Sequence, residues 1–123
     1  MVTYVTIFIY IGGDNMNGEQ NILLHQMKRL VSENKRRFEE RPDRDYVMDL
    51  LEIGITVADT WKHILSLNNN YYIYDSKDSY RTDGKTLIFI KRINGYDVYI
   101  KLRIEDDKNG EPMTICLSFH INQ

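Results

Sequence analysis

The sequence predicts an α+β domain in which N-terminal helices pack on a twisted antiparallel β-sheet. Two alternating runs of β-type residues at positions 86–104 flank Asn94-Gly95, a pair typical of a tight hairpin turn. A third alternating run at 113–121 completes an antiparallel meander over positions 86–121. Between positions 20 and 67, apolar residues recur at the helical period. At 123 residues, the chain is expected to form a single domain, 1–123, with one core.

Residues 1–15 consist of an apolar run at positions 2–11 and a Gly-Gly-Asp-Asn break at positions 12–15, which separates the run from the rest of the chain. Positions 2–11 are rich in β-branched and aromatic residues, which favours an extra strand that adds to the sheet. Met16 offers an alternative start, in which case residues 1–15 are an extension.

Three helices are expected, at 20–38, 43–53 and 56–67. Gly54 is expected to close the second helix, and Thr56-x-x-Asp59 resembles a capping box at the start of the third. The first helix and the segment after it carry many basic residues, which form either a solvated face or a contact for RNA phosphates or an acidic partner. These residues are Lys28, Arg29, Lys35, Arg36, Arg37, Arg41 and Arg44.

A two-residue turn at Asn94-Gly95 fixes the register of the predicted hairpin, because the residues that flank such a turn face each other. The predicted pairs are Ile93–Tyr96, Arg92–Asp97, Lys91–Val98, Ile90–Tyr99, Ile88–Lys101 and Thr86–Arg103. Side chains alternate across a strand, so the second strand has an apolar face toward the core and a second face with Tyr99, Lys101 and Arg103.

The third strand is expected to have its own core face, made of Met113, Ile115, Leu117, Phe119 and Ile121. Thr114, Cys116, Ser118 and His120 then lie on the opposite face. If Asn109-Gly110 also forms a two-residue turn, Tyr99 lies opposite His120 and Lys101 lies opposite Ser118.

The predicted face with Tyr99, Lys101, Arg103 and His120 has the residue types that metal-independent RNA cleavage needs. A base must take the 2′-OH proton, an acid must protonate the departing 5′-oxygen, and cations must stabilise the anionic phosphorane. Histidine serves as acid or base near neutral pH, and tyrosine orients a phosphate or stacks on a base. The plainer interpretation is an ordinary solvent-facing strand.

Composition excludes several other classes of protein. The net charge of −2 gives no general attraction to nucleic acid, so any binding must come from a local patch. No apolar stretch is long enough for a membrane span, and the single cysteine, Cys116, fits a reducing cytoplasm. The three histidines are scattered and match no metal-binding motif, so we expect no metal and no cofactor.

The order of Tyr71-Tyr72, Phe89, INGYDVYIKL and a terminal CLSFH resembles the MqsR-type toxins of bacterial type II toxin–antitoxin systems. The helical segments QMKRLVSENKRRF and LLEIGITVADTWKHILSL also fit that layout, so the resemblance covers roughly residues 23–120. It implies a fold like that of the RelE-type ribonucleases, an endoribonuclease that cuts mRNA at short sequences without a metal, and a cognate antitoxin as partner.

The resemblance also assigns roles to individual residues. Tyr99 matches a proposed catalytic tyrosine, Lys101 matches the lysine of the same strand, and His120 matches a basic or imidazole side chain near the C-terminus. Tyr72 matches the aromatic residue before the loop. Ile73 stands where the best-known branch has a lysine, and the candidates to replace that lysine are Lys77, Arg81 and Lys91.

The leading hypothesis is therefore a cytoplasmic, sequence-selective mRNA endonuclease with His120, Tyr99 and Lys101 as catalytic residues. The expected substrate-binding residues are Arg103, Tyr71, Tyr72, Lys91 and Ser118. The alternative is a non-catalytic domain that kept the toxin fold and binds protein or nucleic acid, and a DNA-binding regulator is a third interpretation. The sequence leaves the oligomeric state open, with a homodimer as one option.

Overall fold

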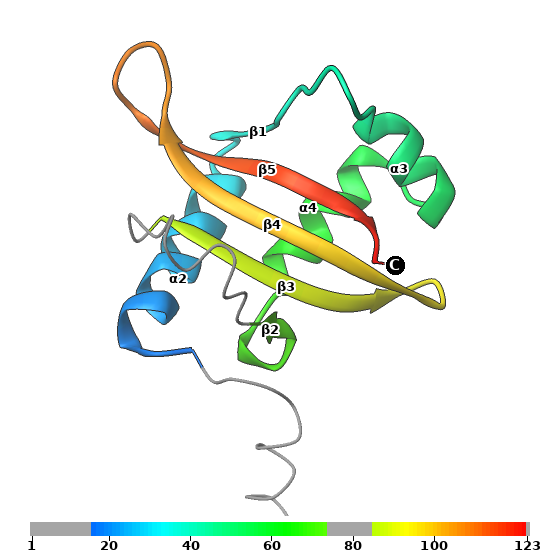
Figure 1. Ribbon diagram of the computed structural model, residues 1–123. Coiled ribbons are helices and arrows are strands. Elements are labelled where there is room, and N and C mark those ends of the chain that lie inside the picture. Colours follow the sequence, from blue (N-terminus) through cyan, green and yellow to red (C-terminus); the bar gives the residue numbers. More distant parts are fainter. Residues whose placement is uncertain (1–15, 74–84, 123) are drawn as a thin grey trace, which may run out of the picture.

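The computed structural model describes residues 16–73 and 85–122 (Figure 1). The strand predicted at positions 2–11 lies outside the described residues, as do Lys77 and Arg81. The described helices are α2 (Gly18–Ser32), α3 (Tyr46–Ile53), α4 (Val57–Leu65) and the short 3₁₀ helix η1 (Asn69–Tyr71). The strands are β1 (Arg36–Phe38), β2 (Tyr72–Ile73), β3 (Thr86–Ile93), β4 (Tyr96–Asp106) and β5 (Pro112–Ile121).

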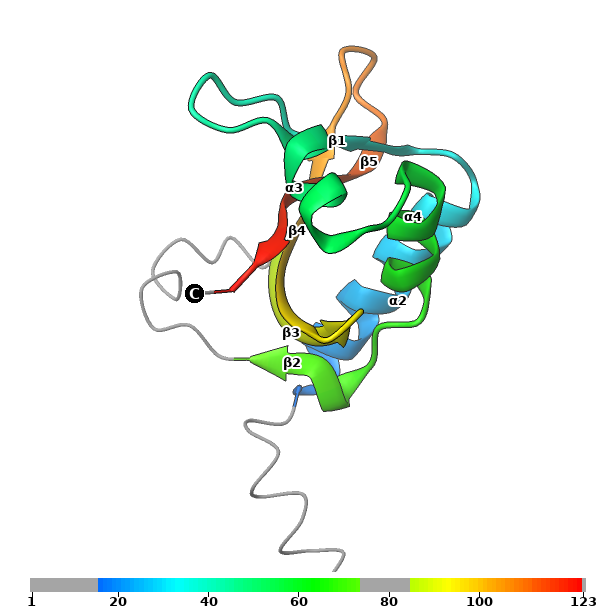
Figure 2. The ribbon, with the colours of Figure 1, turned by 90° about the vertical axis from the view of Figure 1, so that its right-hand side faces the viewer.

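These elements confirm the α+β class, with one correction to the sheet. The five described strands lie in the order β1-β5-β4-β3-β2. The meander β3-β4-β5 is antiparallel as predicted, but β1 pairs with β5 in parallel, so the sheet is mixed. Helices α2 and α4 lie against one face of the curved sheet (Figure 2). The core between these layers includes Met27, Ile64, Phe89, Ile100 and Leu102.

The first helix is shorter than predicted. A capping box between Asn17 and Gln20 begins α2, and the helix ends at Ser32 rather than near Phe38. Asn34 has a φ of 63°, which turns the chain out of the helix and into β1. The basic segment at 36–38 therefore forms an edge strand beside β5 and not the end of a helix.

The second helix ends and the third begins where the sequence predicted, but α3 begins at Tyr46 rather than at 43 and α4 ends at Leu65 rather than at 67. Gly54 closes α3 with a φ of 88°, a conformation that favours glycine. Thr56 and Asp59 form the capping box of α4: Asp59 N–H donates to Thr56 Oγ1 at 3.0 Å, and Thr56 N–H donates to Asp59 Oδ2 at 3.1 Å. These hydrogen bonds hold the pKa of the Asp59 carboxyl below its usual value.

Every predicted pair of the β3–β4 hairpin is present, from Ile93–Tyr96 to Thr86–Arg103. Asn94 and Gly95 have φ values of 51° and 84°, as a two-residue type I′ turn requires. Asn94 Nδ2 also donates a hydrogen bond to Ile53 O at 3.0 Å, which joins the hairpin turn to the end of α3.

The β4–β5 pairing combines the predicted register with an irregularity. Tyr99 lies opposite His120 and Lys101 lies opposite Ser118, as predicted, but Leu102 lies opposite Cys116. Leu117 is therefore an extra residue in β5, a β-bulge. The loop between β4 and β5 has three residues, 108–110, instead of the two that were predicted, because Asp107 N–H donates a hydrogen bond to Glu111 O. The longer loop and the bulge each shift the register by one residue, and the two shifts cancel at His120.

The bulge overturns the predicted faces for the first half of β5. Thr114 and Cys116 pair with the core residues Ile104 and Leu102, and both are buried. Ile115 pairs with Arg103, on the face opposite the helices. The sequence predicted a single core face made of Met113, Ile115, Leu117, Phe119 and Ile121. This prediction is wrong for the residues that precede the bulge, because one inserted residue moves each of their side chains to the other face.

Candidate active site

Strand β4 has an apolar face and a polar face, as the alternation of its residues predicted. The neighbouring strands add buried apolar residues to the second face, Ile88 opposite Lys101 and Ile115 opposite Arg103. Val98, Ile100 and Leu102 are fully buried toward the helices. Tyr99 and Lys101 lie between them in the strand and are only partly buried, on the face turned away from α2 and α4. This polar face is where the structure brings most of the predicted site residues together.

Tyr99 and His120 are in direct contact. Their strands are adjacent, and the two residues are cross-strand partners. The ring centroids lie 5.4 Å apart and the ring planes are inclined by 21°, so the rings stack. The tyrosine ring therefore limits the orientations that the imidazole adopts.

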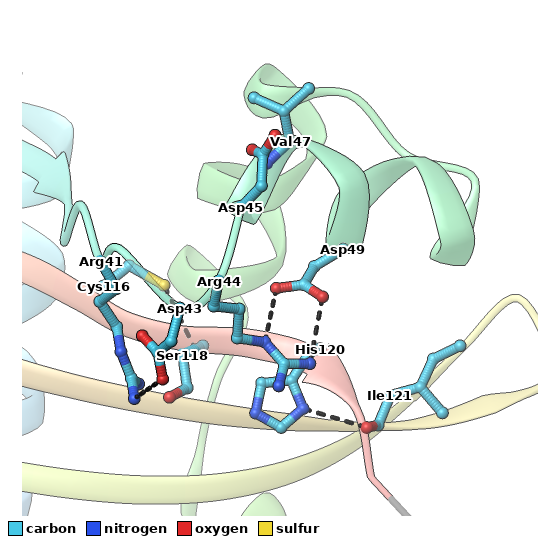
Figure 3. Close-up of polar contacts among 10 residues, drawn as sticks. All are labelled: Arg41, Asp43, Arg44, Asp45, Val47, Asp49, Cys116, Ser118, His120 and Ile121. Atoms are coloured by element: carbon cyan, nitrogen blue, oxygen red, sulfur yellow. Dashed lines mark hydrogen bonds and ion pairs between the residues drawn. The ribbon is translucent and has the colours of Figure 1, made fainter.

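The orientation of His120 is also fixed by the main chain. His120 Nδ1 lies 3.0 Å from Ile121 O (Figure 3). A carbonyl oxygen only accepts hydrogen bonds, so Nδ1 carries a hydrogen atom in this contact. In the neutral ring Nε2 then has the lone pair, and in the imidazolium it has an N–H. This second nitrogen is the atom with which His120 can exchange a proton with a substrate.

Lys101 and Arg103 continue the polar row along β4. Lys101 lies opposite Ser118. Arg103 Nη1 donates to Thr86 Oγ1 at 2.9 Å, and Arg103 Nε lies 3.5 Å from Glu105 Oε2. The guanidinium of Arg103 is thus already held by neighbouring strand residues, and Lys101 is the cation nearer to Tyr99 in the strand.

A pocket of about 440 Å³ opens beside the stacked rings. It is lined by Arg44, Glu52, Tyr99, His120, Ile121 and Asn122. Arg44 lies in the segment before α3, and Glu52 lies in the last turn of α3. The sequence predicts a basic segment that contains Arg44 but does not predict Arg44 or Glu52 as site residues. No periodicity or motif signals either residue, because only the packing of α3 beside β5 brings them to His120.

Arg44 is held in place by Asp49. Nε of Arg44 donates to Asp49 Oδ2 at 2.8 Å, and Nη2 donates to Oδ1 at 3.1 Å (Figure 3). The side chain of Asp49 is 14% exposed, whereas that of Arg44 is 42% exposed. The ion pair is therefore a two-point contact anchored on the more buried partner, which restricts the guanidinium far more than a single exposed contact does.

Three predicted substrate-binding residues do not join this site. Lys91 pairs with the core residue Val98, so its side chain is on the helix side of the sheet, not beside Tyr99. Tyr72 is 6% exposed, its ring packs edge-on against Phe89, and its hydroxyl accepts a hydrogen bond from Gln20 Nε2. Tyr71 packs against the core, and Lys91 Nζ lies 5.4 Å from the centre of its ring.

Lys91 belongs instead to a second polar cluster, between β3 and α4. Its Nζ contacts His63 Nδ1 at 3.0 Å and donates to Ser66 Oγ at 2.5 Å. Burial lowers the pKa of Lys91. Burial and the neighbouring Lys91 charge lower the pKa of His63, while Asp59 opposes this effect. The neutral His63 ring accepts a hydrogen bond from the lysine, so this cluster connects the helix layer to the sheet.

The described residues include no group of three or more His, Cys, Asp and Glu side chains that could hold a metal. Cys116 is buried in the core, and burial raises the pKa of its thiol. Among the described helices, none combines the length and the apolar character that a membrane span requires.

Comparisons of the chain with protein-family models, with curated proteins and with solved structures found no match. The resemblance to the MqsR-type toxins therefore stays a prediction from the sequence motifs.

Proposed function

We propose that this protein is a metal-independent endoribonuclease that cleaves mRNA as the toxin of a type II toxin–antitoxin system. The observation that carries the proposal is the stacked pair of Tyr99 and His120 at the edge of a pocket, with Lys101 next on the same face of β4. The motifs shared with MqsR-type toxins supply the class of substrate and the expectation of an antitoxin. A RelE-like form of the α+β fold is part of the same proposal.

The proposed reaction is attack of a ribose 2′-oxygen on the adjacent phosphorus. The P–O2′ bond forms and the P–O5′ bond breaks, which gives a 2′,3′-cyclic phosphate and a 5′-hydroxyl end. His120 exchanges a proton through Nε2, because its Nδ1 is occupied by Ile121 O. Tyr99 orients the imidazole by stacking and offers its hydroxyl to the phosphate.

The two cations of β4 have different roles because of their distances from Tyr99. A strand rises about 3.4 Å per residue, so Lys101 is about 7 Å and Arg103 about 14 Å from Tyr99 along β4. Lys101 is close enough to neutralise the phosphorane at the cleaved bond. Arg103, which is also engaged by Thr86 and Glu105, contacts a more distant phosphate of the RNA chain.

The test is incubation of purified protein with a long defined mRNA in EDTA without ribosomes, followed by mapping of the RNA ends. Discrete cuts that leave 2′,3′-cyclic phosphates and 5′-hydroxyls support the proposal and give the sequence preference. If no cuts appear, ribosomes are added. Absence of cleavage under both conditions, from folded protein, rejects the nuclease and favours a non-catalytic binding domain.

The toxin role is tested in cells. Expression of the chain should arrest growth, and the variant His120→Ala at the same protein level should not. Growth arrest by both proteins would mean that toxicity does not depend on the proposed chemistry.

A further inference from the structure

Cleavage by 2′-oxygen attack needs two proton transfers, at opposite sides of the phosphorus. One group takes the proton of the 2′-hydroxyl, and another gives a proton to the departing 5′-oxygen. His120 is the imidazole of the proposed site and supplies one of these transfers. The pocket beside His120 also contains the carboxylate of Glu52, which has the chemistry for the other transfer.

We infer that Glu52 is the general base for the 2′-hydroxyl, that His120 is the general acid, and that Arg44 binds the phosphate between them. This inference rests on the proposed ribonuclease function and completes its site with two residues to which the resemblance assigns no role. It follows from the common pocket of Arg44, Glu52, Tyr99 and His120, which three separate segments of the chain form.

The assignment of the two roles follows from the chemistry of the groups. An ionised carboxylate has only acceptor atoms, so Glu52 takes a proton. An imidazolium has two N–H groups, and in His120 one of them is directed to Ile121 O. The other, at Nε2, is then the donor for the 5′-oxygen.

The helix that carries Glu52 is anchored firmly enough to position a base. Leu50 and Ile53 are 3% and 2% exposed and hold α3 in the core. Asn94 donates to the carbonyl oxygen of Ile53, directly after Glu52. Glu52 itself is exposed, and among the described residues it has no ion-pair partner within hydrogen-bonding range.

Arg44 is suited to bind phosphate because Asp49 fixes its plane. Asp49 occupies Nε and Nη2, which leaves both Nη1 donors outside the ion pair. Arg44 and His120 line the same pocket, and Figure 3 shows the two-point contact that holds the guanidinium on Asp49. A cation at this position also offsets the repulsion between the Glu52 carboxylate and an incoming phosphate.

Glu52 takes the 2′-hydroxyl proton while O2′ bonds to phosphorus, and Arg44 and Lys101 neutralise the charge of the phosphorane. The bond from phosphorus to O5′ then breaks, and His120 gives its Nε2 proton to O5′. Glu52 and His120 return to their starting states by exchanging protons with water.

The decisive experiment compares two RNA substrates that contain the mapped cleavage site. The second carries sulfur in place of the bridging 5′-oxygen, so its leaving thiolate needs no proton from an acid. The variants are Glu52→Gln and His120→Ala, with Glu111→Gln as a matched control at the opposite end of the strands. The rate of cleavage is measured for each pair of variant and substrate.

We expect Glu52→Gln to lose about 100-fold or more of the rate on both substrates, as for loss of a general base. His120→Ala should lose a similar factor on the oxygen substrate and regain most of it on the sulfur substrate. Glu111→Gln should cleave like the wild type. A Glu52→Gln rate within threefold of wild type, or rescue of Glu52→Gln by sulfur, overturns the assignment and leaves the ribonuclease proposal standing. Absence of cleavage by the folded wild type, both without and with ribosomes, overturns both.

The role of Arg44 is measured by binding, separately from cleavage. The ligand is the same RNA with a 2′-deoxy nucleotide at the cleavage site, which the protein binds but cannot cut. Arg44→Ala should weaken binding about tenfold or more, Arg44→Lys should restore part of it, and Glu52→Gln should not weaken it. Wild-type affinity in Arg44→Ala would exclude the phosphate contact.

Discussion

The hydroxyl of Thr114 in β5 donates a hydrogen bond of 3.0 Å to the main-chain oxygen of Met27 in α2, and both residues are fully buried. This contact connects the helix layer to the middle of the sheet. It exists because the Leu117 bulge turns Thr114 toward the helices and Ile115 away from them. A polar side chain in the core is therefore satisfied by a helix carbonyl, as a buried hydroxyl must be.

The variant Thr114→Val should lower the free energy of unfolding by about 1–2 kcal/mol, since it removes the donor and keeps the volume. Urea denaturation followed by circular dichroism measures the change. Thr114→Ser retains the hydroxyl and serves as the control for the hydrogen bond. Equal stability of Thr114→Val and the wild type would show that the contact contributes nothing.

The variants His120→Ala and Tyr99→Phe should retain the fold and lose cleavage. The expected loss for His120→Ala is about 100-fold or more, because it removes a proton-transfer group. Tyr99→Phe retains the stacked ring and removes only the hydroxyl, so a smaller loss is expected. Cleavage of a mapped RNA and the circular dichroism spectrum are measured for each, and unchanged cleavage in both variants would remove these residues from the site.

Lys101 and Lys91 form a matched pair for testing which face of the sheet binds RNA. Lys101→Gln should reduce the cleavage rate at least tenfold, because its charge lies on the face of Tyr99. Lys91→Gln should cleave at the wild-type rate, because its side chain contacts His63 and Ser66 on the helix side. If Lys91→Gln were the more defective of the two with its fold intact, the RNA would bind on the other face.

His63 should make the stability depend on pH. Its pKa in the folded protein lies below the unfolded value of 6.5, so the unfolded chain binds the proton more readily. Its contribution to stability is present above pH 6.5 and is lost as the pH falls through the lowered folded-state pKa.

The measurement is the free energy of unfolding at pH 7.5, 6.5 and 5.5. The stability of the wild type should fall across this series, and His63→Gln should reduce the slope. The variant His25→Gln, at an exposed position of α2, is the control. An identical slope in wild type and His63→Gln would exclude His63 as the source.

The thiol of Cys116 should be unreactive in the folded protein. The side chain is 2% exposed and burial raises the pKa of the thiol, so almost no accessible thiolate exists at pH 8. Reaction with a chromogenic disulfide should occur only after denaturant is added. Rapid reaction of the native protein would show that this part of β5 opens frequently.

The sequence determined the features that depend on neighbouring residues. The Asn94-Gly95 turn allowed the β3–β4 register to be predicted pair by pair, since a two-residue loop leaves no freedom in the pairing. The capping box at Thr56 and the closing glycine of α3 are local in the same sense. The contact between Tyr99 and His120 was also predicted, although the two-residue turn assumed for it is a three-residue loop compensated by a bulge.

Tertiary structure alone decided the position of β1, the bulge and the composition of the pocket. Nothing in the strand pattern of β5 marks Leu117 as an extra residue, because apolar residues alternate without a break from Met113 to Ile121. The arrangement with the bulge places Thr114 against Met27. Arg44 and Glu52 meet His120 only because α3 docks beside β5. Contacts between residues far apart in the chain depend on how whole elements pack, and a single sequence contains no local signal for them.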